Sequence, residues 1–99
     1  ITGIVSLLDA ATIGFVNSAK EFGLSIPKDL SIIGVNMLES QAESTHPPIS
    51  TVTFDAYEMA KSCGKMMVES IEAGKNNKKK RTELWVGDFV DRGSATHIQ

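Results

Sequence analysis

The 99 residues carry 10 basic and 12 acidic side chains, which gives a formal net charge of −2. This balance excludes a strong overall field of the kind that attracts nucleic acid or an anionic membrane. The single cysteine excludes an internal disulfide and a metal site with several cysteine ligands, so we expect a cytoplasmic protein. The chain opens on a strand-like segment without Met, contains no long apolar run and shows no signal peptide. These features predict a piece of a longer protein with no membrane segment.

Two short apolar segments, residues 3–8 and 30–35, flank a helical pattern near the start of the chain. The second is a near-continuous apolar run, typical of a buried strand covered by helices on both faces. Between them, the spacing of apolar residues predicts a helix over about 10–22 with Asp9 as its N-cap. Gly23 can adopt the left-handed conformation that ends a helix. Strand, helix and strand in this order predict a right-handed crossover that joins two parallel strands.

The second half of the chain has the pattern of one long helix and a final strand. A polar stretch after residue 35 predicts a loop with one or two helical turns, and residues 49–54 suit an extended segment. Apolar side chains then recur at helical spacing over about 56–73. We expect a final strand from Thr82 to about Arg92, and a peripheral tail from Gly93 onward.

Five cations lie in the run from Lys75 to Arg81. Such a run can indicate contact with nucleic acid. It contains no interleaved aromatic residue or Gly, and it stands where a helix must turn into a strand. We therefore favour a solvated connecting loop.

Four segments, in order along the chain, resemble the effector-binding domain of LacI/GalR-type transcriptional regulators. The best match runs from Ala19 to Gly34, where the family has Pro, a short polar pair and then Ser-Ile/Val-Ile/Val-Gly. The family's Pro-Pro-Leu-Thr-Thr-Val/Ile is similar to residues 47–52, and its Leu-Val-x-Arg-x-Ser is similar to residues 89–94. The remaining match is Leu7-Leu8-Asp9 with Thr12 and Gly14, which keeps the family's Asp and Gly and lacks its Asn.

This resemblance implies an α/β fold, a fragment of the periplasmic-binding-protein-like (type I) fold with a parallel sheet flanked by helices. Residues 1–53 would form the second half of the C-terminal lobe, and residues 54–99 the last helix and strand of the N-terminal lobe plus a tail. The implied function is the ligand-sensing and dimerisation part of a homodimeric regulator. The family's DNA-binding domain would lie outside this fragment, so operator DNA would be bound by the parent protein and not by these residues.

Ligands of open α/β sheets bind beyond the carboxyl ends of the strands, which points to Leu8, Asp9 and Asn36, with Phe54 after the crossing. The resemblance places effector contacts or their neighbours at these positions. Sugar-binding members have Asn, Asp and commonly Gln where this chain has Leu8, Asn36 and Phe54. We therefore expect a small-molecule effector other than a common sugar, or a protein corepressor. An alternative role for Asp9 is to cap the helix that follows it. An alternative role for Asn36 is to form a hydrogen bond with the backbone of its loop.

The sequence contains no residue pattern that predicts catalysis, metal binding or cofactor binding. His46 has no second ligand nearby, Cys63 lies on a helical apolar face, and there is no Gly-rich phosphate loop. Two other functions remain open: a periplasmic-type solute-binding protein, and a fragment of a small α/β enzyme. The Pro-Pro crossing followed by one helix and one strand favours the regulator, because a doubly wound enzyme would continue with regular strand-helix units.

Overall fold

The computed structural model describes residues 1–75 and 80–97. The chain forms two compact units, which are described separately. The first contains Ile1–Thr53 and Asp88–Gln99, and the second contains Phe54–Gly87. Residues 88–97 pack in the first unit, while the assignment of residues 54–99 to the N-terminal lobe plus a tail stays a prediction. The interpretation of residues 76–79 as a connecting loop lies outside the described residues.

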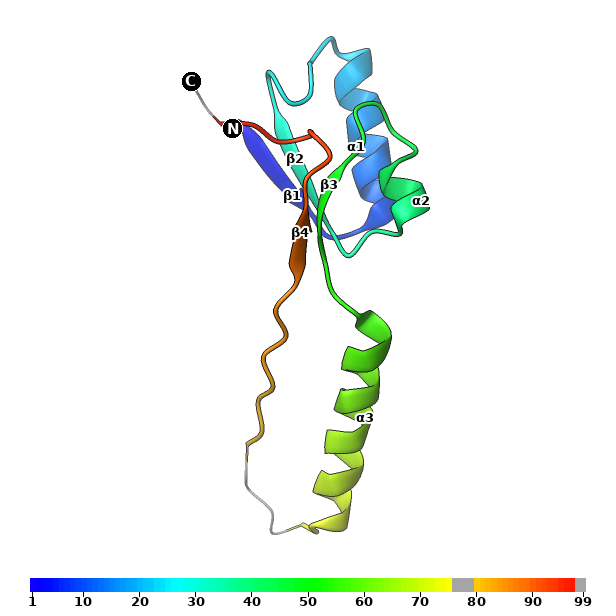
Figure 1. Cartoon of the computed structure of the whole chain (residues 1–99), viewed down its shortest axis with the longest axis vertical. Coiled ribbons are helices and arrows are strands. Elements are labelled where there is room, and N and C mark those ends of the chain that lie inside the picture. The colour runs from blue at the N-terminus through cyan, green and yellow to red at the C-terminus, as the bar shows by residue number, and fades with distance from the viewer. Residues whose placement is uncertain (76–79, 98–99) are drawn as a thin grey trace. The chain divides into compact units, whose positions relative to one another are not determined.

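The first unit is built on a four-stranded sheet with the order β1-β2-β3-β4 (Figure 1). Its strands are β1 (Gly3–Ser6), β2 (Ser31–Val35), β3 (Ser50–Thr53) and β4 (Asp88–Val90). The first three strands are parallel, and β4 runs antiparallel to β3. The predicted pair of adjacent parallel strands is therefore confirmed.

Helix α1 (Asp9–Glu21) joins β1 to β2 and packs on the sheet through one stripe. Its buried residues are Thr12, Val16 and Ala19, which follow at helical spacing. The helix ends where predicted, because Gly23 takes a φ of 78° and its N–H donates to the carbonyl of Lys20.

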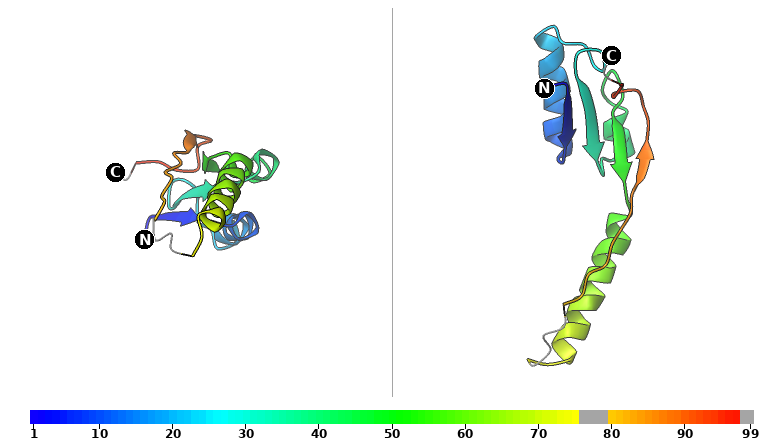
Figure 2. Two further views of the ribbon diagram at one scale, coloured as in Figure 1. Left: turned by 90° about the horizontal axis from the view of Figure 1, so that it is seen from below. Right: turned by 90° about the vertical axis from the view of Figure 1, so that its left-hand side faces the viewer.

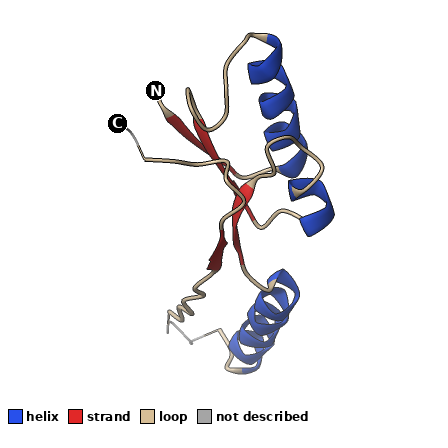
Figure 3. Cartoon of the chain, turned by 45° about the horizontal axis from the view of Figure 1, so that its top comes forward, coloured by secondary structure: helices blue, strands red, loops and turns tan. Residues whose placement is uncertain are grey.

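Both helices of the first unit, α1 and the short α2 (Glu39–Ala42), lie on the same face of the sheet (Figure 2 and Figure 3). Burial along β2 accordingly alternates: Ile32 and Gly34 are buried, while Ile33 and Val35 are only half-buried. The predicted α/β fold with a mostly parallel sheet flanked by helices is therefore confirmed. Among the described residues, the helices of this unit cover one face of the sheet and not both. The core beneath the helices consists of Val16, Ile32, Met37, Ala42 and Ile49.

The final strand is much shorter than predicted. It covers Asp88–Val90, whereas residues 82–87 have no regular secondary structure. The apolar side chains of Leu84 and Val86, on which the longer strand was predicted, are 86% and 84% exposed. Apolar composition alone therefore does not make a strand where the chain offers no pairing partner.

The tail after β4 is not peripheral, which corrects the sequence interpretation. Ser94 is fully buried; its hydroxyl donates to the carbonyl of Ile32 (2.6 Å) and accepts from the N–H of Ser50 (2.7 Å). The Ser50 hydroxyl donates to Asp91 (3.2 Å), and Arg92 donates to the carbonyl of Ile49 (2.9 Å).

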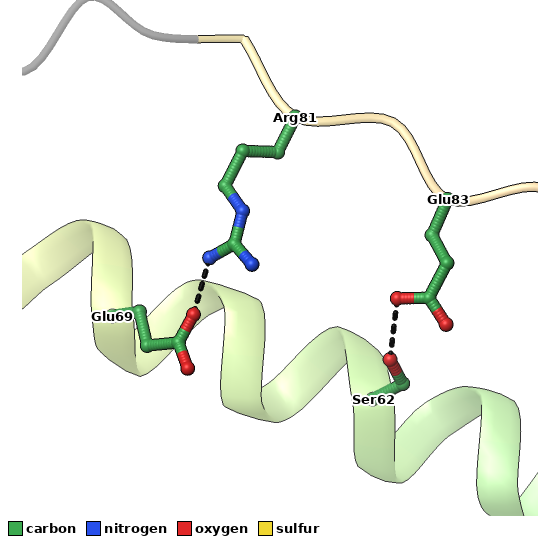
Figure 4. A network of polar contacts seen from close by, with 4 residues as sticks. All are labelled: Ser62, Glu69, Arg81 and Glu83. Carbon is green, nitrogen blue, oxygen red and sulfur yellow. Dashed lines mark hydrogen bonds and ion pairs between the residues drawn. The ribbon is translucent and has the colours of Figure 1, made fainter.

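The second unit consists of helix α3 (Ala56–Glu72) and the segment that follows it. The helix begins as predicted near residue 56, because the Asp55 carboxylate caps it and accepts from the N–H of Glu58 (3.0 Å). Two polar contacts tie the later segment to the helix: Ser62 donates to Glu83 (2.7 Å), and Arg81 donates to Glu69 (Figure 4).

Substituting Gly34 tests the close packing under β2. A Cβ at this position would overlap the Met37 sulfur and lie 3.4 Å from Ile49 Cγ2. We expect Gly34→Ala to lower the free energy of unfolding by about 1–3 kcal/mol, as overpacked cores do. Gly14 in α1 has no atom within 4 Å of such a Cβ, so Gly14→Ala should instead stabilise by about 0.5–1 kcal/mol. Urea denaturation of both variants measures the two effects; equal stability of Gly34→Ala and the unmodified chain would contradict the packing.

The contact between Arg81 and Glu69 makes a prediction about pH. The hydrogen bond from Arg81, helped by the charges of Arg81 and Lys65, holds the pKa of the Glu69 carboxyl below its ordinary value, although burial opposes this. Because the folded pKa is lowered, the contact is fully present above the unfolded pKa of about 4.3 and is lost as the pH falls through the folded value. In an NMR titration, Arg81→Gln should raise the pKa of Glu69.

The matched control for this titration is Lys61→Gln, which removes a cation 3.9 Å from Glu58 on the same helix. It should leave the pKa of Glu69 unchanged. If Arg81→Gln shifts Glu69 no more than Lys61→Gln does, the second unit is not held together in this way.

Candidate ligand-binding edge

The carboxyl ends of β1 and β2 meet at one edge of the sheet because the two strands are parallel and in register from Gly3 with Ser31 to Ser6 with Gly34 (Figure 1). Residues 7–9 follow β1, and residues 36–38 follow β2. We call these two turns the strand-end edge. In open α/β sheets such an edge is where ligands bind.

Leu8 is held by its backbone and exposes its side chain. It is the N-cap residue of α1, and its carbonyl accepts from both the N–H and the hydroxyl of Thr12, each at 2.9 Å. The Thr12 hydroxyl also contacts the hydroxyl of Ser6 at 2.6 Å. The Leu8 side chain is 67% exposed and that of Leu7 is 77% exposed. Both turn residues therefore offer apolar surface from a fixed backbone.

Asp9 does not cap its own helix, which corrects the prediction. It is the first residue of α1, and no side chain caps that helix. Its Oδ2 instead accepts from the backbone N–H of Leu38 at 3.3 Å. The physical reason is the position of the N-cap: Leu8 takes the extended conformation before the helix, with φ −134° and ψ 125°. The Asp9 side chain is then one residue too late to cap and reaches across to the neighbouring turn.

Asn36 adopts a left-handed backbone conformation with a φ of 50°, a region that Asn tolerates better than most residues. Its N–H donates to the carbonyl of Val52 at 2.7 Å. The next residue, Met37, is 5% exposed and belongs to the core, and Leu38 is 64% exposed. In the turn after β2, the side chain of Met37 is therefore buried in the core, and that of Leu38 is exposed at the strand-end edge.

Three of the four predicted contacts come together, and the fourth is not placed with them. Leu8, Asp9 and Asn36 belong to the strand-end edge. Phe54 is the first residue of the second unit and is half-buried there. Sequence reasoning missed Leu38, which joins the edge through a bond to a residue 29 positions away; its apolar side chain after a strand was the available signal.

Two hollows among the described residues are lined by residues away from the strand-end edge. One has a volume of about 550 Å³ and lies at the amino ends of β1 and β2, opposite that edge; it is lined by Thr2, Pro27, Lys28, Asp29, Ser31, Thr96 and His97. A hollow of about 380 Å³ in the second unit has Met59, Cys63, Met66 and Trp85 among its lining residues. The polar side chains around the first are mostly exposed, so it is an open groove rather than an enclosed site. We therefore rank the strand-end edge above it on topology.

Within residues 1–75 and 80–97, no cluster of three His, Cys, Asp or Glu side chains has the geometry to hold a metal ion. Within the same ranges, every helix is too short or too polar to cross a membrane.

Known proteins resemble this chain over almost its whole length. Residues 2–95 match the family described as "Periplasmic binding protein-like domain". An uncharacterised HTH-type transcriptional regulator in the aml 5′ region of Streptomyces limosus is 35% identical over 95 residues, which are 94% of this chain and 26% of that protein. The HTH-type transcriptional repressor PurR of Vibrio vulnificus is 28% identical over 94 residues, 92% of this chain and 28% of that protein. The chain thus spans about a quarter of the length of these relatives.

Solved structures of regulators superpose on the same fold. A transcription regulator from Lactobacillus plantarum matches with a TM-score of 0.69 and 28% identity, over 99% of this chain and 36% of that one. The structure of the transcriptional regulator CelR in complex with cellobiose matches with a TM-score of 0.71 and 17% identity, over 96% of this chain and 28% of that one. The second likeness shows the fold alone.

Proposed function

The chain belongs to the periplasmic binding protein-like domain family, and on that premise we propose that it is the ligand-sensing and dimerisation part of a LacI/GalR-type transcriptional regulator. The observation that carries the proposal is that relatives over more than nine-tenths of the chain are named HTH-type transcriptional regulators. The same names favour a regulator over a solute-binding protein or an enzyme fragment. A cytoplasmic, non-enzymatic protein fits this role.

In this proposal, residues 1–53 are the second half of the C-terminal lobe of the effector-binding domain. The chain leaves the first unit after Thr53 and returns at Asp88, so the helix of residues 56–72 is the part that it contributes to the N-terminal lobe. The parent protein binds operator DNA through a domain outside these residues. An effector acts by preferring one arrangement of the lobes, which shifts the population toward that arrangement.

Dimerisation is assigned to the surface formed by α1 and by residues 38–44. Exposed apolar side chains support this assignment, since Leu38 is 64% exposed and Phe15 is 36% exposed. The resemblance to LacI/GalR-type regulators implies a dimer surface on the helix that begins near Ala10 and on the segment from Leu38 to Ser44. Isolated apolar side chains are normal on a surface, but two on these segments agree with an isologous contact in a homodimer.

The effector is a compound other than a common hexose or pentose. The strand-end edge presents Leu8 where sugar-binding relatives of this type have an amide, and Asn36 where they have a carboxylate. Each missing hydrogen bond to a neutral group is worth about 0.5–1.5 kcal/mol, and to a charged group about 1.5–3 kcal/mol. An apolar or aromatic small molecule, or a protein corepressor, suits exposed leucines better than a sugar does.

Calorimetry on the intact regulator tests the effector class. Glucose, galactose, ribose and arabinose should show no binding with a micromolar Kd. The double change Leu8→Asn and Asn36→Asp should strengthen binding of at least one of them by about tenfold or more, because it restores an amide and a carboxylate. Micromolar sugar binding by the unmodified protein would contradict the assignment.

The matched control carries the same two chemical changes away from the edge, Leu24→Asn and Asn17→Asp. Leu24 follows α1, and its side chain is 47% exposed, while Asn17 lies on the exposed surface of that helix. This variant should bind sugars no better than the unmodified protein. An equal gain in both variants would show that the change in charge and polarity, and not its position, is responsible.

A further inference from the structure

One carboxylate connects the two turns of the strand-end edge. Asp9 stands at the start of α1, and its Oδ2 accepts from the N–H of Leu38, 29 residues later in the chain. Asp9 is half-buried, whereas Leu8 before it and Ala10 after it are exposed. The first turn is itself fixed to the sheet, since Thr12 joins Leu8 to Ser6. Because the first turn is fixed, the bond from Asp9 also fixes the position of the second turn, residues 36–38, relative to the sheet.

The turn after β2 is held at each of its three residues. The N–H of Asn36 donates to Val52, the side chain of Met37 is buried in the core, and the N–H of Leu38 donates to Asp9. Asn36 has a positive φ, a conformation that suits Asn and lets the chain turn sharply after β2. Of the three attachments, the one at Leu38 is the only one made by a charged side chain.

Leu38 also begins α2, with extended angles of φ −61° and ψ 136°. Its carbonyl accepts from the N–H groups of Gln41 and Ala42. Without Asp9, the N–H of Leu38 loses this partner, and the turn keeps only its attachments at Asn36 and Met37. We expect the start of α2 and the turn to be less firmly fixed, up to Asn36 two residues earlier.

We infer that Asp9 is a positioning residue of the effector site: through its bond to Leu38 it fixes residues 36–38, so that Asn36 is presented at the edge. This inference rests on the proposed function for the meaning of the site, and it departs from the sequence expectation that Asp9 is an effector contact. It assigns the specificity of the edge to Leu8 and Asn36.

If Asp9 acted only on its own helix, the effects of substituting it would be different. A carboxylate in the first turn of a helix is favourable because it faces the positive end of the helix dipole. That effect needs the charge and not the bond to Leu38. Asp9→Asn removes the charge and keeps an acceptor oxygen, while Asp9→Ala removes both, so the pair of variants separates the two roles.

Amide hydrogen exchange and side-chain NMR shifts on the full chain test the inference without any ligand. Asp9→Ala should speed exchange of the Leu38 amide by about tenfold, which corresponds to about 1.4 kcal/mol, and should move the side-chain amide resonances of Asn36. Asp9→Asn should keep the Leu38 rate within about threefold of the unmodified chain and leave Asn36 in place, because a neutral hydrogen bond remains.

Asp29→Ala is the matched control. Its carboxylate also accepts a backbone N–H, that of Ser25 at 2.8 Å, but before β2 and away from the edge. It should lower overall stability without changing Leu38 or Asn36. The inference is overturned if Asp9→Ala leaves both readouts unchanged, or if Asp9→Asn perturbs them as much as Asp9→Ala. These spectra require no effector, so a failure of the proposed function in the calorimetry would not be confused with either result.

Discussion

One residue of the tail, Ser94, completes the hydrogen bonding of the sheet in the first unit through its carbonyl and its hydroxyl. Strand β3 begins at Ser50, level with Ile33 of β2, so the polar backbone of Ile32 has no strand residue beside it on that side. Ser94 fills the place: its carbonyl accepts from the N–H of Ile32 at 2.9 Å, and its hydroxyl donates to the carbonyl of Ile32. Buried backbone groups without partners cost about 1–3 kcal/mol each. A residue from the end of the chain therefore completes the middle of the sheet.

This constraint reaches the strand-end edge through β2. The same hydroxyl accepts from Ser50, which fixes the start of β3 against β2. With β2 and β3 in register, Gly34 lies against Met37. The turn that carries Asn36 can then bury the Met37 side chain in the core. The carboxyl ends of β1 and β2 are then brought level, and Asp9 reaches Leu38. The tail thus makes its polar contacts with the same strand, β2, whose carboxyl end leads into the turn that carries Asn36.

Periodicity and turn chemistry were enough to predict β1, α1, β2 and α3, because apolar spacing and Gly23 act within a few residues of where they stand in the sequence. The remaining features depend on long-range polar contacts, which leave no periodic pattern. Ser94 bonds to a residue 62 positions away and Asp9 to one 29 positions away, so the buried tail and the bond between Asp9 and Leu38 were not predictable. The final strand was overestimated because Leu84 and Val86 suit a strand by composition while pairing with β3 covers only Asp88–Val90. Phe54 belongs to the second unit, so its part in the site stays a prediction.

The most direct measurement is the stability and amide exchange of the Ser94→Ala chain, with Ser44→Ala as control. Ser44 also donates to a backbone carbonyl, that of Gln41 at 2.6 Å, but is exposed. If the Ser94 hydroxyl completes the sheet, its removal lowers the free energy of unfolding by about 1–3 kcal/mol and speeds exchange at Ser50, whose N–H loses its acceptor. The N–H of Ile32 keeps the backbone carbonyl of Ser94 as its partner, and Ser44→Ala should change stability by less than about 0.5 kcal/mol. Equal stabilities of the two variants, with Ser50 still protected in Ser94→Ala, would contradict this account.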